Sequence, residues 1–293
     1  MLRLPQGLPA VETLQAEGYA VAEYNLWAVP TDARVVLLLN LMPQKAVTEL
    51  DIARALSFPD TDVLLLPVRI AGQTYKTTPI EHILAYYVDI ETILSNKLHF
   101  SSAPSLIITG APVEQMPFEE VRYWPQLCEI MDWAFRHRLN TLYICWGAQA
   151  GLYHHYGIPK YDKTAKCFGI FSQDVLDDKC PLMRGLSPAF FMPNSRHTEV
   201  RRSDFSAPQL QIVAESQESG VGVAYDAAHR STFIVGHLEY EPHTLENEYK
   251  RDLAKGLSIL PPQHYYEADD PNGRILWQWK EHARQFYRNW LEL

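Results

Sequence analysis

The sequence is poor in the features that mark membrane, nucleic-acid-binding and disulfide-stabilised proteins. Its 293 residues include four cysteines, with no C-x-x-C pair and no regular spacing, which argues against a disulfide framework and a metal site. The net charge is −9 and the sequence has no basic block, so it lacks the basic surface expected of a nucleic-acid-binding protein. No apolar run reaches the length of a membrane span, and residues 1–7 lack a signal-peptide core. We therefore expect a cytoplasmic protein.

Nucleotide-binding motifs are also missing. Neither a P-loop nor a G-x-G-x-x-G is present, so nucleotide phosphoryl transfer and dinucleotide redox chemistry have no motif here. What the chain does have is 47% hydrophobic and only 21% charged residues, enough to bury a sizeable core. No interdomain linker is evident. We expect one domain over residues 1–293, with an N-terminal arm at 1–33 and a C-terminal helix at 274–293.

Strand-like and helix-like segments alternate through the first half of the chain. Apolar runs at 35–40, 62–68, 105–109 and 141–144 predict buried strands, with helices between them. Thr78, Pro79 and Glu81 form the pattern of a capping box, which predicts a helix start. Further strands are expected at 168–175, 210–215, 221–225 and 232–235. This order predicts an α/β fold with a mostly parallel sheet flanked by helices.

The stretch 140–151 has the layout of a nucleophile elbow. An apolar strand at 141–144 leads into Cys145, and a helix follows at 148–156. A thiol there faces the positive end of the helix, which favours the thiolate. The alternative is a buried structural cysteine at a strand end.

A base and an orienting carboxylate are available at the end of another strand. His237 and Glu239 directly follow the strand at 232–235, so they are candidates for a Cys-His-Glu triad with Cys145. The backbone N–H groups of Trp146 and Ala111 are candidates for an oxyanion hole, from topology alone. From these residues a hydrolase, a glutamine amidotransferase and an acyltransferase fit equally.

Eight blocks spread over nearly the whole chain carry a resemblance to a known family. They are NLMP at 40–43, ITGAPVE at 108–114, PFEEV at 117–121, ICWGAQA at 144–150, YGIPK at 156–160, SRHTEV at 195–200, GHLEY at 236–240 and DDP at 269–271. Together they resemble the homoserine O-acyltransferases. The resemblance implies a class I glutamine-amidotransferase-like (flavodoxin-like) fold, a homodimer, no metal or bound cofactor, and acyl transfer from acyl-CoA to an amino-acid hydroxyl.

The resemblance also implies residue roles. Cys145 matches the acyl-thioester nucleophile, His237 the proton acceptor and Glu239 its orienting carboxylate. Positions matching the residues that hold the amino acid are Lys166, Ser195 and Arg251. Glu114 matches the position that separates donors, and Glu there is typical of relatives that use acetyl-CoA.

Four positions depart from the family pattern and bear on the acceptor. They are Gln73, Tyr75, Asn194 and Leu238. Bulkier residues could shorten the acceptor pocket by one methylene, the difference between L-homoserine and L-serine, worth about 1–3 kcal/mol. We expect an L-homoserine O-acetyltransferase of methionine biosynthesis, with L-serine and cysteine biosynthesis as the alternative. A cysteine hydrolase or amidotransferase and a non-catalytic relative are remoter alternatives.

Overall fold

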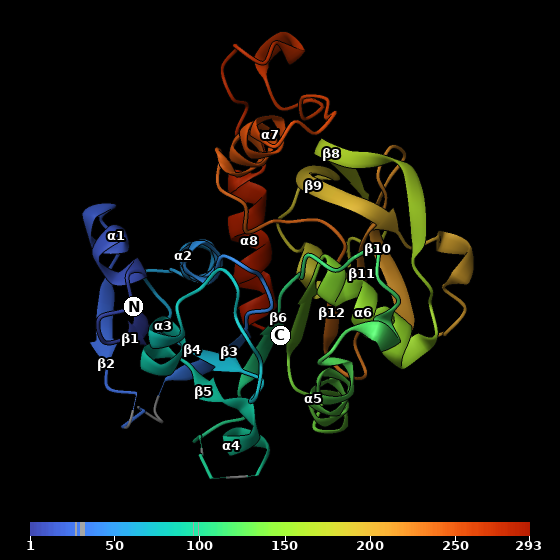
Figure 1. Cartoon of the computed structure of the whole chain (residues 1–293). Coiled ribbons are helices and arrows are strands. Elements are labelled where there is room, and N and C mark those ends of the chain that lie inside the picture. Colours follow the sequence, from blue (N-terminus) through green and yellow to red (C-terminus); the bar gives the residue numbers. More distant parts are fainter. Residues whose placement is uncertain (27, 30–32, 96, 99) are drawn as a thin grey trace.

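The computed structural model describes residues 1–26, 28–29, 33–95, 97–98 and 100–293, whose strands form one twelve-stranded sheet (Figure 1). The strands are β1 (Leu2–Pro5), β2 (Val21–Tyr24), β3 (Arg34–Leu39), β4 (Val63–Arg69), β5 (Val88–Asp89), β6 (Ser105–Ile108), β7 (Thr141–Ile144), β8 (Tyr161–Val175), β9 (Ala189–Glu199), β10 (Leu210–Ser216), β11 (Gly220–Asp226) and β12 (Ser231–Ile234). Their spatial order is β2-β1-β4-β3-β6-β7-β12-β11-β10-β8-β9, with β5 beside β4.

The helices described by the structure connect these strands. They are α1 (Ala10–Ala16), α2 (Lys45–Ala55), α3 (Ile80–Tyr86), α4 (Ile90–Leu94), α5 (Trp124–Arg136), α6 (Trp146–Tyr156), α7 (Thr244–Ala254) and α8 (Lys280–Leu291), with short 3-10 turns η1 (Phe118–Glu120), η2 (Pro181–Met183), η3 (Arg202–Asp204) and η4 (Glu267–Asp269). The expected α/β fold is confirmed.

The sheet has a parallel half and an antiparallel half. Neighbouring strands from β2 to β12 run parallel, whereas β12, β11, β10, β8 and β9 pair antiparallel. Ile144 at the end of β7 pairs with Ile234 at the end of β12. Parallel pairing therefore brings the residues that follow both strands to one edge of the sheet, where ligands bind in open α/β folds.

Alternate side chains of the central strands enter two separate cores. On β3, Val36 and Leu38 pack with residues of α1, α2 and α8, while Val35, Leu37 and Leu39 pack with residues of α4, α5 and α6. Successive strand residues point to opposite faces, so a strand covered on both faces needs apolar residues throughout. This explains the continuous apolar runs.

Residues 1–33 differ from the expected arm. β1 pairs with β4 and β2 pairs with β1, so this segment extends the sheet by two strands. Each strand has only four residues, too short for a clear period. Residues 27 and 30–32 lie outside the described residues. The terminal helix α8 begins at Lys280 instead of 274, after Trp279 at its N-cap.

The capping box expected at Thr78 is wrong. Helix α3 begins at Ile80, with Pro79 in the N-cap position and no side-chain cap. The Thr78 hydroxyl donates instead to the carbonyl of Pro43, at 2.9 Å. A tertiary hydrogen bond has thus replaced the local cap, and it ties the loop before α3 to the loop before α2.

The main element that the sequence pattern misses is β9, which pairs with β8 in a long hairpin. Of β8, the strand expected at 168–175 covers the second half. β9 contains Pro193 and Arg196, residues that are atypical of a buried strand. Arg196 is nevertheless buried, and its guanidinium donates to the Thr198 carbonyl at 2.6 Å and to Asn194 Oδ1 at 3.2 Å. These bonds replace the solvation that the charge loses on burial.

Helix α8 contacts segments from several parts of the chain. Asn140, just before β7, donates from Nδ2 to the Trp290 carbonyl at 2.7 Å. Asn289 donates to the Leu182 carbonyl at 2.9 Å, and Arg34 at the start of β3 donates to the Leu291 carbonyl. Helix α8 therefore packs against one face of the central strands and is hydrogen-bonded to residues at the start of β3 and just before β7 (Figure 1).

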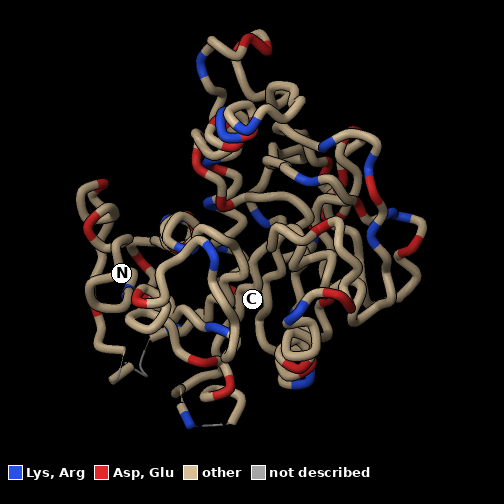
Figure 2. Tube along the Cα trace, in the orientation of Figure 1, with Lys and Arg blue, Asp and Glu red and all other residues tan. Residues whose placement is uncertain are grey.

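Charged residues of both signs are distributed over the whole trace (Figure 2). In the described part of the chain, no helix combines the length and apolarity needed to cross a bilayer.

Candidate active site

Cys145 occupies a sharp turn between β7 and α6. Its φ is 53° and its ψ is −115°, a positive φ that is uncommon for a residue other than glycine. The turn is fixed on both sides, because Cys145 N donates to the Ile234 carbonyl at 2.7 Å and Gln149 N donates to the Cys145 carbonyl at 3.1 Å. The side chain stays partly exposed at the N-terminus of α6. The predicted elbow is confirmed in its geometry.

Gly147 allows α6 to approach the end of β6 closely. A Cβ at this position would lie 2.7 Å from the carbonyl oxygens of Ile108 and Thr109. The close approach places the start of α6 beside the segment that carries Ala111. Trp146 is the first residue of α6, so its N–H has no partner within the helix. The oxyanion hole expected from the N–H groups of Trp146 and Ala111 stays a prediction.

His237 and Glu239 form a buried pair. His237 Nδ1 lies 2.6 Å from Glu239 Oε1, and the two residues are only 4% and 8% exposed. Nε2 is therefore the ring nitrogen left to face the thiol. Burial lowers the pKa of His237, but neighbouring Cys145 and Glu239 raise it by more, so the pKa lies well above its usual 6.5. Such a histidine is suited to carry a proton beside a thiolate.

The backbone of His237 is held by β9. Its N–H donates to the Pro193 carbonyl at 2.9 Å. A Cβ on the preceding Gly236 would lie 2.6 Å from that same oxygen, so glycine is needed for the contact.

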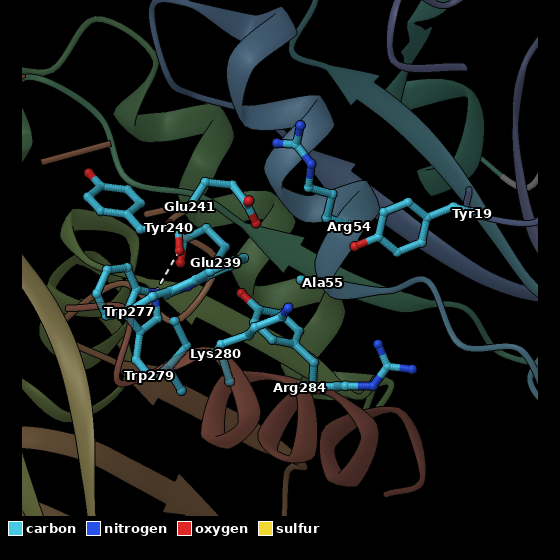
Figure 3. A pocket seen from close by; sticks show the side chains of 13 residues that line it. Tyr19, Arg54, Ala55, Glu239, Tyr240, Glu241, Trp277, Trp279, Lys280 and Arg284 are labelled. Carbon is cyan, nitrogen blue, oxygen red and sulfur yellow. Dashed lines mark hydrogen bonds between the residues drawn. The ribbon is translucent and has the colours of Figure 1, made fainter. Parts of the chain in front are cut away.

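A brace from the start of α8 supports the loop that carries the pair. The Tyr240 ring stacks on His237, with 4.0 Å between ring centroids and 14° between the planes. Trp279 Nε1 donates to the Tyr240 carbonyl at 2.7 Å. Figure 3 shows Glu239, Tyr240 and Glu241 beside Trp277 and Trp279 at a cavity of about 70 Å³. The brace fixes the loop, and with it the imidazole.

Lys166 and Ser195 converge on carboxylates of α7. Ser195 Oγ donates to Glu248 Oε2 at 2.5 Å, and Lys166 Nζ lies 3.6 Å from the same oxygen and 3.7 Å from Asp252 Oδ2. Tyr240 donates its hydroxyl hydrogen to Glu248 Oε1 at 3.0 Å. Because Tyr240 also stacks on His237, this cluster is linked to the triad.

Arg251 joins the cluster from its rim. Its Nε donates to Asp252 Oδ1 at 2.8 Å, and its side chain is 48% exposed. The sequence analysis missed Glu248 and Asp252. Arg251 and Asp252 follow Glu248 by three and four residues, which places all three on neighbouring parts of one helical face. This spacing was the available signal.

Glu114 lies against β9 beside the helix of the elbow. Its Oε2 accepts a hydrogen bond from His197 N at 2.8 Å and lies 3.3 Å from Thr198 Oγ1. Thr198 Oγ1 in turn donates to Gln149 Oε1, on α6, at 2.9 Å. The Glu114 carboxylate is thus linked through Thr198 to Gln149, one turn of α6 from Cys145.

Within the described residues, none of the four departures from the family pattern makes a side-chain hydrogen bond to the cluster around Glu248. Gln73 and Tyr75 line a separate cavity beyond the ends of β3 and β4. Asn194 is buried, donates to the Met192 carbonyl at 3.2 Å and accepts from Arg196. Leu238 is buried in the core.

A possible metal-ligand group lies at the opposite end of α6 from Cys145. Among the described residues, ligand atoms of Asp132, His154 and His155 lie within 4.8 Å of one another. Its distance along the helix separates it from the chemistry of the thiol.

Comparison with known proteins agrees with this geometry. A family model described as homoserine O-succinyltransferase matches residues 1–293. The chain belongs to the homoserine O-acyltransferase family. Homoserine O-acetyltransferases from Bacteroides thetaiotaomicron and Parabacteroides distasonis are each 47% identical over 293 residues, covering 99% of this chain and 94% and 93% of theirs. One from Desulfitobacterium hafniense is 42% identical, with 99% and 94% covered.

Solved structures similar to this family member share its fold at low identity. A glutamine amidotransferase from Thermotoga maritima aligns with a TM-score of 0.57 and 14% identity, over 89% of this chain and 96% of that one. A glutamine amidotransferase from Methylobacillus flagellatus gives 0.56 and 11%, over 90% and 95%. The expected class I glutamine-amidotransferase-like fold is confirmed.

Proposed function

We propose that this chain transfers an acetyl group from acetyl-CoA, through a thioester on Cys145, to the side-chain hydroxyl of L-homoserine. The observation that carries the proposal is the buried His237–Glu239 pair beside a thiol on a strained elbow. The homoserine O-acetyltransferases that are 47% identical over nearly the full length support both substrates.

In the first half-reaction, the Cys145 thiolate attacks the carbonyl carbon of the thioester. The N–H groups of Trp146 and Ala111 stabilise the oxyanion of the tetrahedral intermediate. When the intermediate collapses, the carbon–sulfur bond to CoA breaks, and protonated His237 gives its proton to the departing CoA sulfur. The acetyl group is then held on Cys145.

In the second half-reaction, neutral His237 accepts the proton of the acceptor hydroxyl through Nε2. The hydroxyl oxygen attacks the acetyl carbon, and the Cys145 sulfur leaves as the thiolate. Glu239, hydrogen-bonded to Nδ1 at 2.6 Å, holds the ring in one tautomer and stabilises the imidazolium that forms. The thiolate–imidazolium pair is thereby restored.

The cluster near the triad carries both signs of charge that a zwitterionic amino acid requires. Lys166 and Arg251 can bind a carboxylate, and an Arg fork does so in a bidentate manner. Glu248 and Asp252 can accept hydrogen bonds from an ammonium group. Ser195 already donates to Glu248, so the serine orients this carboxylate toward the acceptor.

Glu114 supports acetyl-CoA as the donor. The family model is described by succinyl transfer, whereas the similar relatives are described by acetyl transfer, so the donor has to be argued from this position. A carboxylate held beside the elbow by His197 N repels and crowds the terminal carboxylate of a succinyl group. An acetyl group carries no such charge.

The alternatives lack a supporting observation in the structure. L-serine was suggested by three departures from the family pattern. Gln73 and Tyr75 line another cavity, and the side chain of Asn194 bonds to Met192 and Arg196 of its own strand and not to the cluster that would hold the amino acid. Similarity to glutamine amidotransferases extends only to the fold, at 11–14% identity.

Intact-mass spectrometry of the protein mixed with acetyl-CoA tests the proposal. We expect an acetyl adduct on the wild type, none on Cys145→Ala, and discharge of the adduct by L-homoserine faster than by L-serine or water. No adduct on the wild type would contradict the thioester mechanism. Faster discharge by L-serine would make L-serine the acceptor in place of L-homoserine. Discharge by water alone would indicate a hydrolase.

A further inference from the structure

A second cavity lies beside the candidate active site, on the opposite side of Cys145 from the Glu248 cluster. It has a volume of about 410 Å³, within the usual range for ligand pockets. The loops after β3, β4 and β6 and the start of α5 line it. In the sheet, β4, β3 and β6 lie to one side of β7, whereas β12, β8 and β9 lie to the other. The two sites therefore flank the thiol.

The lining of this cavity is cationic in an acidic protein. Its charged residues are Lys45, Arg69, Lys76 and Arg122, and no carboxylate is among the lining residues, all of which the structure describes. The whole chain, by contrast, has a net charge of −9. Such a lining selects an anionic ligand.

Two of these cations are free to bind a ligand. Arg69 is paired with Asp89 at 2.6 Å, and Lys45 is buried and donates to the carbonyls of Asn40 and Met42. Lys76 and Arg122 are exposed and, within the described part of the chain, have no ion-pair partner. Arg122 Nη1 donates only to Thr74 Oγ1, at 3.2 Å.

Gly110 lies between this cavity and the thiol. A Cβ placed on Gly110 would lie 3.4 Å from Cys145 Cβ and 3.7 Å from Sδ of Met42, which lines the cavity. Pro112 and Val113 of the same loop also line it. A ligand held among the cations therefore lies next to the loop that borders the thiol.

We infer that this cavity binds the phosphate-bearing adenosine end of acetyl-CoA, so that donor and acceptor approach Cys145 from opposite sides. The inference rests on the proposed acetyl transfer. Lys76 and Arg122 bind phosphate oxygens, as such side chains commonly do. Tyr75 and Tyr123, also in the lining, are aromatic side chains against which the adenine can pack. Gln73 and Tyr75, two of the departures from the family pattern, thereby belong to the donor side.

The kinetic test compares two donors. Acetyl-CoA carries the phosphates, whereas S-acetyl-N-acetylcysteamine has the same thioester and no phosphate. For Lys76→Ala and Arg122→Ala, the ratio of kcat/KM for acetyl-CoA to kcat/KM for the short thioester should fall roughly two- to fivefold each, and about tenfold in the double variant. Lys179→Ala, an exposed lysine outside the cavity, is the matched control and should leave the ratio unchanged.

Calorimetric titration of Cys145→Ala with free CoA tests the site without catalysis. The double substitution in this background should raise the Kd about tenfold, and Lys179→Ala should not change it. An unchanged Kd and an unchanged donor ratio would place the CoA site elsewhere, even if the acetyl adduct forms. If the double substitution weakens CoA binding but the wild type forms no acetyl adduct, the cavity is retained as the CoA site and the acetyl transfer is refuted.

Discussion

Replacing Glu239 by Gln tests the role of the triad carboxylate with little change in shape. The substitution removes the charge that accepts the 2.6 Å hydrogen bond from His237. A hydrogen bond to a charged group contributes about 1.5–3 kcal/mol, and each 1.36 kcal/mol is a factor of ten in rate. Glu239 Oε2 is buried and has no hydrogen-bond partner among the described residues, so the new NH₂ finds no acceptor there. We expect acylation to slow by roughly 10- to 150-fold.

The assay is the single-turnover rate of CoA release from acetyl-CoA as a function of pH. Since Glu239 is one of the groups that raise the pKa of His237, Glu239→Gln lowers that pKa. Protonated His237 is the form that gives its proton to CoA, so the alkaline limb of the profile should move to lower pH. A uniform drop in rate without this movement would indicate a merely structural effect.

Glu241→Gln is the matched control. Glu241 is only two residues further along and lines the same small cavity (Figure 3), and burial raises the pKa of its carboxyl. It makes no hydrogen bond to His237 within the described structure. We expect its acylation rate to stay within about twofold of wild type. Equal losses in both variants, or none in Glu239→Gln, would refute the triad.

Three further substitutions test other parts of the structure. Gly147→Ala forces a Cβ to 2.7 Å from the Ile108 carbonyl oxygen, so the start of α6 must move. Calorimetry should show that the free energy of unfolding falls by about 1–3 kcal/mol, and acylation should be nearly abolished. An active, stable variant would contradict this. Glu114→Gly should gain acylation by succinyl-CoA in the mass assay, and unchanged donor selectivity would count against the proposed role. Burial and the nearby Glu239 raise the pKa of Asp51 to about 8, whereas an unfolded Asp titrates near about 3.9. The folded state therefore binds more protons between these values, and this contribution to stability is lost as pH rises toward 8. The Tm of wild type should accordingly fall more from pH 5 to pH 8 than that of Asp51→Asn, and parallel curves would exclude the effect.

The sequence predicts best where one segment contains its own evidence. The elbow at Cys145 combines an apolar strand, a turn and a helix ended by Gly157 in the left-handed region, and all three are present. The strands at 35–40 and 105–109 are found because burial on both faces demands an unbroken apolar run. His237 and Glu239 could be placed near Cys145 because their strand pairs in parallel with β7.

Features decided by distant contacts escape a local reading. Thr78 follows the capping pattern, but its hydroxyl donates to the carbonyl of Pro43, 35 residues earlier in the chain. The sequence pattern misses β9 because the buried Arg196 is satisfied by carbonyls of Thr198 in β9 itself and of Ser219 in the turn between β10 and β11. Glu248 resembles a solvated helix charge until β9 brings Ser195 to it. For the same reason the sequence could not tell that Gln73 and Tyr75 line a cavity to which Lys166 does not belong.

The fastening of the central strands by α8 has a consequence for biosynthesis. The chain leaves the ribosome N-terminus first, yet Asn140 and Arg34 find their carbonyl partners only on residues 290–291. Trp279, which braces the loop of His237 through Tyr240, is also made late. Until residues 279–291 emerge, the face of β3 and β7 that α8 covers is only partly buried by α1 and α2, and incompletely folded chains expose apolar surface. A nascent chain that lacks these residues therefore has neither the contacts of α8 with the central strands nor the brace on the loop of His237.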